Sequence, residues 1–75
     1  MPRGEFSVCV FYADEKYEYT KRFVSAPQAM NEFTFQTNSI TAKTGAVARV
    51  IITDGGDCIN AEWKYGEGIV FPPQG

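Results

Sequence analysis

Residues 46–63, AVARVIITDGGDCINAEW, decide the fold of this chain. Two apolar runs flank Gly55-Gly56, a pattern that predicts a hairpin with a two-residue turn in which both glycines have positive φ. This turn sets apolar residues opposite one another on one face: Ile52 with Ile59, Val50 with Ala61, and Ala48 with Trp63. The other face pairs Ile51 with Asn60 and Arg49 with Glu62. The opposite charges of Arg49 and Glu62 support this register.

A second hairpin is predicted over residues 5–24. Apolar and polar residues alternate in residues 6–12 and again in residues 17–23, as in half-buried strands. A turn at Asp14-Glu15 gathers the aromatic residues on one face, with these pairs: Tyr12 with Tyr17, Val10 with Tyr19, Val8 with Lys21, and Phe6 with Phe23. A slip of one residue would move every side chain to the other face, so we expect the register to be well specified.

The segment between the hairpins predicts a helix within residues 26–44. Ser25 and Gln28 form a capping box, with Pro27 in the first turn. One narrow helical stripe follows: Ala26, Met30, Phe33, Thr37 and Ile40. Thr44-Gly45 supplies a C-terminal stop. Residues 33–37 have poor helix propensity and also fit a strand, so this alternative stays open.

The chain is therefore predicted to be one α+β domain over residues 1–75. We expect a four-stranded antiparallel sheet, in the order hairpin, helix, hairpin (ββαββ), with one helix on one face. Residues 66–73 form a candidate edge strand that Pro72 and Pro73 would end. Seven residues are expected to be buried against the helix: Phe6, Val10, Phe23, Val50, Ile52, Ile59 and Trp63.

Composition limits the functional classes. The net charge of −2 disfavours a general nucleic-acid binder, which needs a basic face. The chain has no histidine, which excludes most zinc sites and all histidine-based catalysis, and we expect no cofactor or metal. No apolar run is long enough to cross a membrane. Cys9 and Cys58 are expected to be reduced thiols in a cytoplasm.

Candidate binding residues lie on the face of the sheet that the single helix cannot cover. They are Phe11, Arg22, Arg49, Ile51 and Asn60. Aromatic and arginine side chains favour protein contacts, whereas one exposed aromatic is fewer than the two or three that usually stack bases. Phe35 lies off the helical stripe and is either a second core anchor or an exposed contact. Asp54 and Asp57 are interpreted as turn residues and not as calcium ligands.

Residues 49–60 (RVIITDGGDCIN), followed by Glu62-Trp63-Lys64, resemble the hairpin at the end of small uncharacterised bacterial proteins. That resemblance implies no activity and no functional residue. The hairpin–helix–hairpin layout is also similar to that of some phage-encoded inhibitors of bacterial defence, as a likeness of architecture.

The leading expectation is a non-enzymatic protein-binding module, either an inhibitor of the phage or mobile-element type or a small homodimer. The alternative is a single-stranded nucleic-acid binder that uses Phe11 and the arginines. An enzyme is disfavoured, because each candidate nucleophile or acid–base group lacks its partner.

Overall fold

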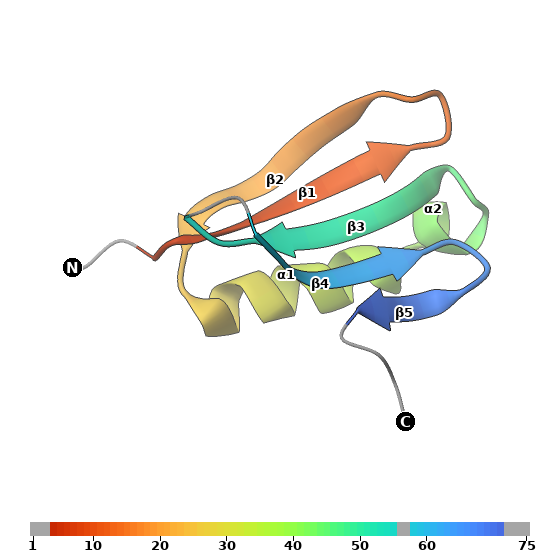
Figure 1. Ribbon diagram of the computed structural model, residues 1–75. Coiled ribbons are helices and arrows are strands. Elements are labelled where there is room, and N and C mark those ends of the chain that lie inside the picture. Colours follow the sequence, from red (N-terminus) through yellow and green to blue (C-terminus); the bar gives the residue numbers. More distant parts are fainter. Residues whose placement is uncertain (1–3, 56–57, 72–75) are drawn as a thin grey trace.

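The computed structural model describes residues 4–55 and 58–71. In chain order, the elements are β1 (Phe6–Tyr12), β2 (Tyr17–Val24), α1 (Ala26–Thr37), α2 (Ile40–Lys43), β3 (Val47–Thr53), β4 (Ile59–Lys64) and β5 (Gly68–Phe71). The strands form one antiparallel sheet in the order β2-β1-β3-β4-β5 (Figure 1). The α+β class is confirmed. The prediction of four strands and one helix had too few elements, because the candidate edge strand and a second short helix are both formed.

The helices lie on one face of the sheet, and α1 packs against β1, β2 and β3 (Figure 1). The core between the layers is mainly aliphatic: Val8, Val10, Ala29, Phe33, Ala42, Val47, Val50, Ile52 and Ala61. Val10, Val50 and Ile52 are buried as expected. Phe6 and Trp63 are only partly buried against this cluster. The opposite face of the sheet has no helix over it among the described residues, and we call it the helix-free face.

The register of the first hairpin differs from the prediction at its turn. Tyr12 N donates to Lys16 O at 2.8 Å, which makes a three-residue loop, and Glu15 has φ of +73°. A residue with positive φ at the third position is typical of such loops. As a result, Phe11 pairs with Tyr17, whereas the prediction paired Tyr12 with Tyr17. Tyr17 consequently lies on the helix-free face.

Two irregularities in β2 then change the register again. Cys9 pairs with Tyr19, but Val8 pairs with Lys21, so Thr20 is the extra residue of a bulge. The predicted pairing of Val8 with Lys21 is thereby recovered. At the next irregularity, Phe6 pairs with Val24 and not with Phe23. The prediction that Phe23 is buried was wrong, since 47% of this residue is exposed.

The second hairpin also has a longer connection than predicted. Its strands end at Thr53 and begin again at Ile59, and Asp54 and Cys58 are joined by backbone and side-chain hydrogen bonds. Gly55 does not have the predicted positive φ, and Gly56 lies outside the described residues. The pairs shift by two residues, so Val50 lies opposite Trp63 and Ile52 opposite Ala61. A shift of two keeps each side chain on its predicted face.

Near its start, β4 departs from the predicted alternation. A bulge lies between the pairs Ile52–Ala61 and Thr53–Ile59. Ile59 was expected in the core, but 37% of it is exposed. The bulge explains why the alternation of the sequence fails at this end of the strand.

The predicted helix is divided into two. The capping box at Ser25 and Gln28 is confirmed, with Pro27 in the first turn. The side chains of Asn38 and Ser39 donate to the carbonyl oxygens of Thr34 and Gln36 at 2.8 Å, which ends α1. Ser39 then caps α2 by accepting from Ala42 N. The predicted stop at Thr44-Gly45 ends α2, where Gly45 has φ of +88°.

Gly4 lies directly against the backbone that leads into α1. A Cβ atom placed on Gly4 would be 1.9 Å from the carbonyl carbon and oxygen of Val24. Such an approach excludes every side chain. The beginning of β1 and the end of β2 are therefore packed against each other without any intervening side chain.

Candidate functional site

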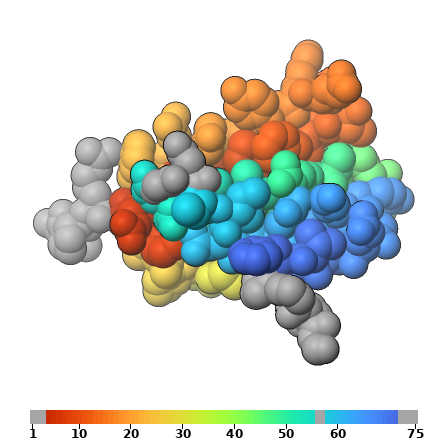
Figure 2. Space-filling model, in the orientation of Figure 1, coloured from red at the N-terminus to blue at the C-terminus, as the bar shows by residue number. Residues whose placement is uncertain are grey.

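The helix-free face is organised in rows that cross the strands. One row contains Tyr17, Phe11, Arg49 and Lys64, which are successive cross-strand partners on β2, β1, β3 and β4. The next row contains Tyr19, Cys9, Ile51 and Glu62 on the same strands. Figure 2 shows the strands side by side, from β2 at the top to β5 below. The register therefore brings exposed aromatic and charged side chains from four strands onto one surface.

Three aromatic residues form a cluster on this face. The rings of Phe11 and Tyr17 are 5.8 Å apart between centroids and tilted by 35°. The rings of Tyr17 and Tyr19 are 6.3 Å apart and meet edge to face at 85°. Tyr17 is 62% exposed and Tyr19 is 43% exposed. The cluster is therefore larger than the single exposed aromatic, Phe11, that the sequence predicts.

Two arginines lie over these rings. The Cζ atom of Arg22 is 4.6 Å from the centroid of Tyr19, and that of Arg49 is 5.1 Å from the centroid of Phe11. Both distances are typical of cation–π contacts. We call the group of Phe11, Tyr17, Tyr19, Arg22 and Arg49 the aromatic–arginine face. Its side chains are held by one another before any partner binds.

Arg49 also forms an ion pair with Glu62. The predicted contact is present, but Glu62 lies directly opposite Ile51, and the residue directly opposite Arg49 is Lys64. The ion pair is therefore diagonal across the strands. It fixes the guanidinium of Arg49 beside the ring of Phe11.

Ile51 and Cys9 lie beneath this surface. Ile51 is 7% exposed and Cys9 is 2% exposed, although neither belongs to the core cluster under α1. Ile51 was expected to meet solvent or a partner, and that was wrong because the larger neighbouring side chains cover it. Burial raises the pKa of the Cys9 thiol, and the nearby Arg49 guanidinium offsets part of this rise. A thiol kept neutral in this way is a weak nucleophile.

Two predicted site residues lie elsewhere. Asn60 lines a pocket on the helix side, because the bulge at the start of β4 turns it away from Ile51. Phe35 is in α1, 67% exposed, and takes no part in the core cluster. The structure thus brings Phe11, Arg22, Arg49 and Ile51 together but separates Asn60 and Phe35 from them.

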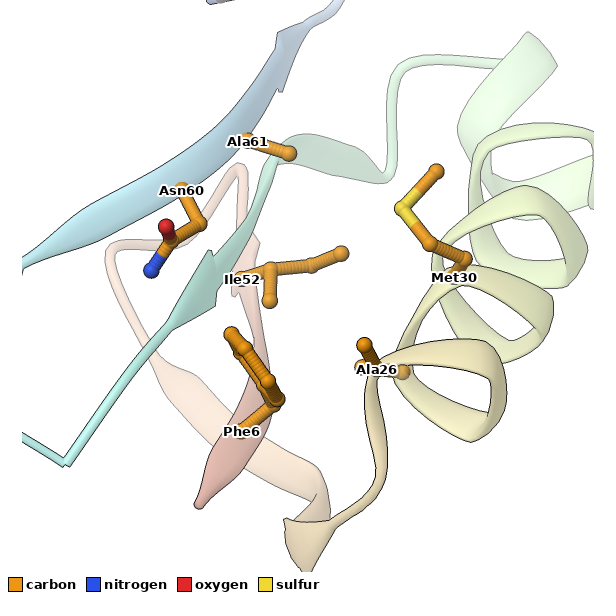
Figure 3. Close-up of a pocket in the computed structure, with 7 residues that line it drawn as sticks. Phe6, Ala26, Met30, Ile52, Asn60 and Ala61 are labelled. Atoms are coloured by element: carbon orange, nitrogen blue, oxygen red, sulfur yellow. The ribbon is translucent and has the colours of Figure 1, made fainter. Parts of the chain in front are cut away.

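The pocket beside Asn60 is a concave feature on the helix side of the sheet. It lies between α1 and the sheet, with Phe6 and Ile52 on one side and Ala26 and Met30 on the other (Figure 3). Its volume is about 200 Å³, below the ~300 Å³ at which ligand pockets usually begin. Asn60 is its one polar lining residue, so the pocket offers no acid, base or nucleophile.

The described part of the chain offers neither a metal site nor a membrane-spanning helix. Within residues 4–55 and 58–71, no group of three or more His, Cys, Asp or Glu side chains could hold a metal ion. In the same residues, no helix has the length and apolar character needed to span a bilayer. Cys9 is buried and Cys58 is exposed, and no disulfide joins them.

Comparisons of the chain with protein-family models, curated proteins and solved structures gave no match. The interpretation of the site therefore rests on its own geometry.

Three residues of this surface were not singled out from the sequence. Tyr17 and Tyr19 were assigned to the core face, since the predicted turn was one residue out of register. Lys64 was not assigned to either face, because the predicted hairpin ended at Trp63. If the turn had been predicted as a three-residue loop over residues 13–15, both tyrosines would have been placed on the correct face.

Proposed function

We propose that this protein is a small non-enzymatic protein-binding module that contacts its partner through the aromatic–arginine face. One observation carries the proposal: the register places Tyr17 and Tyr19 beside Phe11 on the face without a helix. Tyrosine and arginine are the residue types that most often dominate binding energy at protein interfaces. The partner is either a protein that this module inhibits or a second copy of the chain.

The way the surface is built supports binding in preference to catalysis. The cation–π contacts and the Arg49–Glu62 ion pair hold the exposed side chains in position. Ordering long side chains before binding lowers the entropic cost of association. The thiol under this face, that of Cys9, is buried and has a raised pKa.

Single-stranded nucleic acid is the second candidate ligand, and a specific observation favours it. The cluster contains Phe11, Tyr17 and Tyr19, the number of aromatics that sheet platforms use to stack bases. Two features count against it. Tyr17 and Tyr19 are nearly perpendicular, and arginines already lie over the rings of Phe11 and Tyr19.

The test compares two double variants with matched chemistry. Phe11→Ala, Arg22→Ala changes the aromatic–arginine face, and Phe35→Ala, Lys43→Ala removes an exposed aromatic and a cation from the helices. Self-association is measured by sedimentation, and partners are captured from the source cell and identified by mass spectrometry. We expect both variants to fold, and only the first to lose association.

Retained association in the Phe11→Ala, Arg22→Ala variant would overturn the proposal. Loss in the Phe35→Ala, Lys43→Ala variant alone would move the working surface to the helical layer. Binding of an oligothymidylate that requires Phe11 would favour the nucleic-acid alternative.

A further inference from the structure

Two cations lie side by side on the helix-free face. Lys64 is the direct cross-strand partner of Arg49. Like charges in directly opposite positions destabilise a sheet. Glu62 pairs with Arg49, whereas Lys64 has no ion pair within residues 4–55 and 58–71. Lys64 is exposed, so its charge is available to a ligand at the surface.

On the strands around the aromatic cluster, the cations outnumber the carboxylates. Arg22, Arg49 and Lys64 are the cations of the helix-free face, and Glu62 is the carboxylate paired among them. The protein as a whole has a net charge of −2. A local excess of one sign attracts ligands of the other sign even when the net charge would repel them.

The cations border the aromatic cluster. Arg22 lies over Tyr19 at the β2 edge, and Arg49 lies over Phe11 in the middle of the sheet with Lys64 beyond it on β4. Arginine presents a planar fork of donors that matches a carboxylate, and lysine adds a point charge. An acidic side chain at this position would accept hydrogen bonds from Arg49 and Lys64 while its neighbours contact the rings.

We infer that the partner of the aromatic–arginine face is an acidic protein surface, with a carboxylate seated between Arg49 and Lys64. This inference rests on the proposed protein-binding function and adds the chemistry of the partner. The edge-to-face rings favour a protein over a run of stacked bases, because successive bases need ring faces that are open and nearly parallel. A second copy is disfavoured as the occupant, because two copies would bring the same cations together.

The experiment uses a fluorescein-labelled polyglutamate peptide as the probe and an oligothymidylate of equal charge as the competing ligand. Lys64→Gln removes the neighbour of Arg49 that has no ion pair within the described residues. Lys43→Gln removes the same charge from α2, on the helix side of the sheet. Binding is followed by fluorescence anisotropy at low and high salt, and each variant is checked for folding by circular dichroism.

We expect the wild-type protein and Lys43→Gln to bind polyglutamate alike, and Lys64→Gln to bind about three- to tenfold more weakly at low salt. The difference should shrink at high salt, because exposed charges are screened. Equal weakening by both variants would show a net-charge effect and overturn the inference. Absence of polyglutamate binding, or tighter binding of the oligothymidylate, would also overturn it.

Different outcomes would contradict the protein-binding function and the acidic nature of the partner. If a captured partner is lost with Phe11→Ala, Arg22→Ala but kept at full affinity with Lys64→Gln, the protein-binding function stands and the acidic partner does not. If neither variant affects the partner, the helix-free face is not the working surface.

Discussion

The two faces of the sheet bury side chains by different means. Under α1, aliphatic residues such as Val8, Val10 and Val50 pack in a closed layer with no exposed surface. On the helix-free face, Cys9 and Ile51 are buried by neighbouring aromatic and charged side chains that remain partly in solvent. Close packing in a core supplies most of the free energy of folding, whereas exposed contacts add little. We therefore expect substitutions under α1 to lower stability and substitutions on the helix-free face to affect binding.

The largest expected effect contrasts two phenylalanines of α1. Phe33 is 3% exposed and Phe35 is 67% exposed. Phe33→Ala should lower the free energy of unfolding by ~3–5 kcal/mol, which is about the whole stability of a core this small. Phe35→Ala should change it by less than ~0.5 kcal/mol. Urea denaturation followed by circular dichroism measures both.

A folded Phe33→Ala variant with a normal urea midpoint would show that α1 does not hold the core together. Equal losses in the two variants would mean that Phe35 is covered in solution, and sedimentation would then show whether a second copy covers it.

A smaller effect concerns the two thiols. Cys9 is buried on the helix-free face and Cys58 is exposed. We expect a thiol reagent to modify Cys9 at least ~100-fold more slowly than Cys58, because Cys9 must wait for local opening. Tyr19→Ala should raise the Cys9 rate, since Tyr19 is its cross-strand neighbour. Tyr65→Ala, an exposed tyrosine outside this face, should not.

The same thiol has a predictable pH dependence. Burial raises the pKa of Cys9 above that of an unfolded thiol. Its contribution to stability is complete below the unfolded pKa and is lost as the pH rises through the raised pKa of the folded state. Wild-type protein should therefore lose more stability between neutral and alkaline pH than Cys9→Ala. Equal losses in urea midpoint would contradict this assignment.

The smallest expected effect concerns the charged residues Arg49, Glu62 and Lys64. The side chains of Arg49 and Glu62 are 33% and 15% exposed. Glu62→Gln should cost up to ~1 kcal/mol, because it removes a partly exposed ion pair and leaves Arg49 beside Lys64. Adding Lys64→Gln should recover part of that loss. A double variant less stable than Glu62→Gln alone, measured by urea denaturation at low salt, would show that Lys64 does not repel Arg49.

The sequence predicted the covered face better than the helix-free face, and the reason is geometric. In the second hairpin, a register error of two residues left Val50, Ile52, Ala61 and Trp63 on the correct side. In the first hairpin, an error of one residue moved Tyr17 and Tyr19 to the opposite side. Local signals such as the capping box at Ser25 were read correctly because all their atoms are close in sequence.

The parts of the first hairpin that the sequence did not predict depend on rare backbone conformations. Glu15 and Phe23 have positive φ, which few residues with a side chain adopt. The bulge at Thr20 leaves its hydroxyl buried with no hydrogen-bond partner in the described residues, a costly arrangement that no composition rule favours. Phe11, Arg22 and Arg49 were identified as candidates from strand alternation and residue type, but the tyrosines that complete the cluster depend on these turns and bulges.

Gly4 constrains how this chain can change over evolutionary time. Even a single methyl group there would meet the carbonyl of Val24 at 1.9 Å, whereas the next residue, Glu5, is exposed. A side chain at position 4 would thus be selected against in any lineage that keeps this contact, whereas the exposed position 5 meets no such steric limit. We therefore expect a glycine before the first strand in any sequence that brings its first strand this close to the carbonyl of the second.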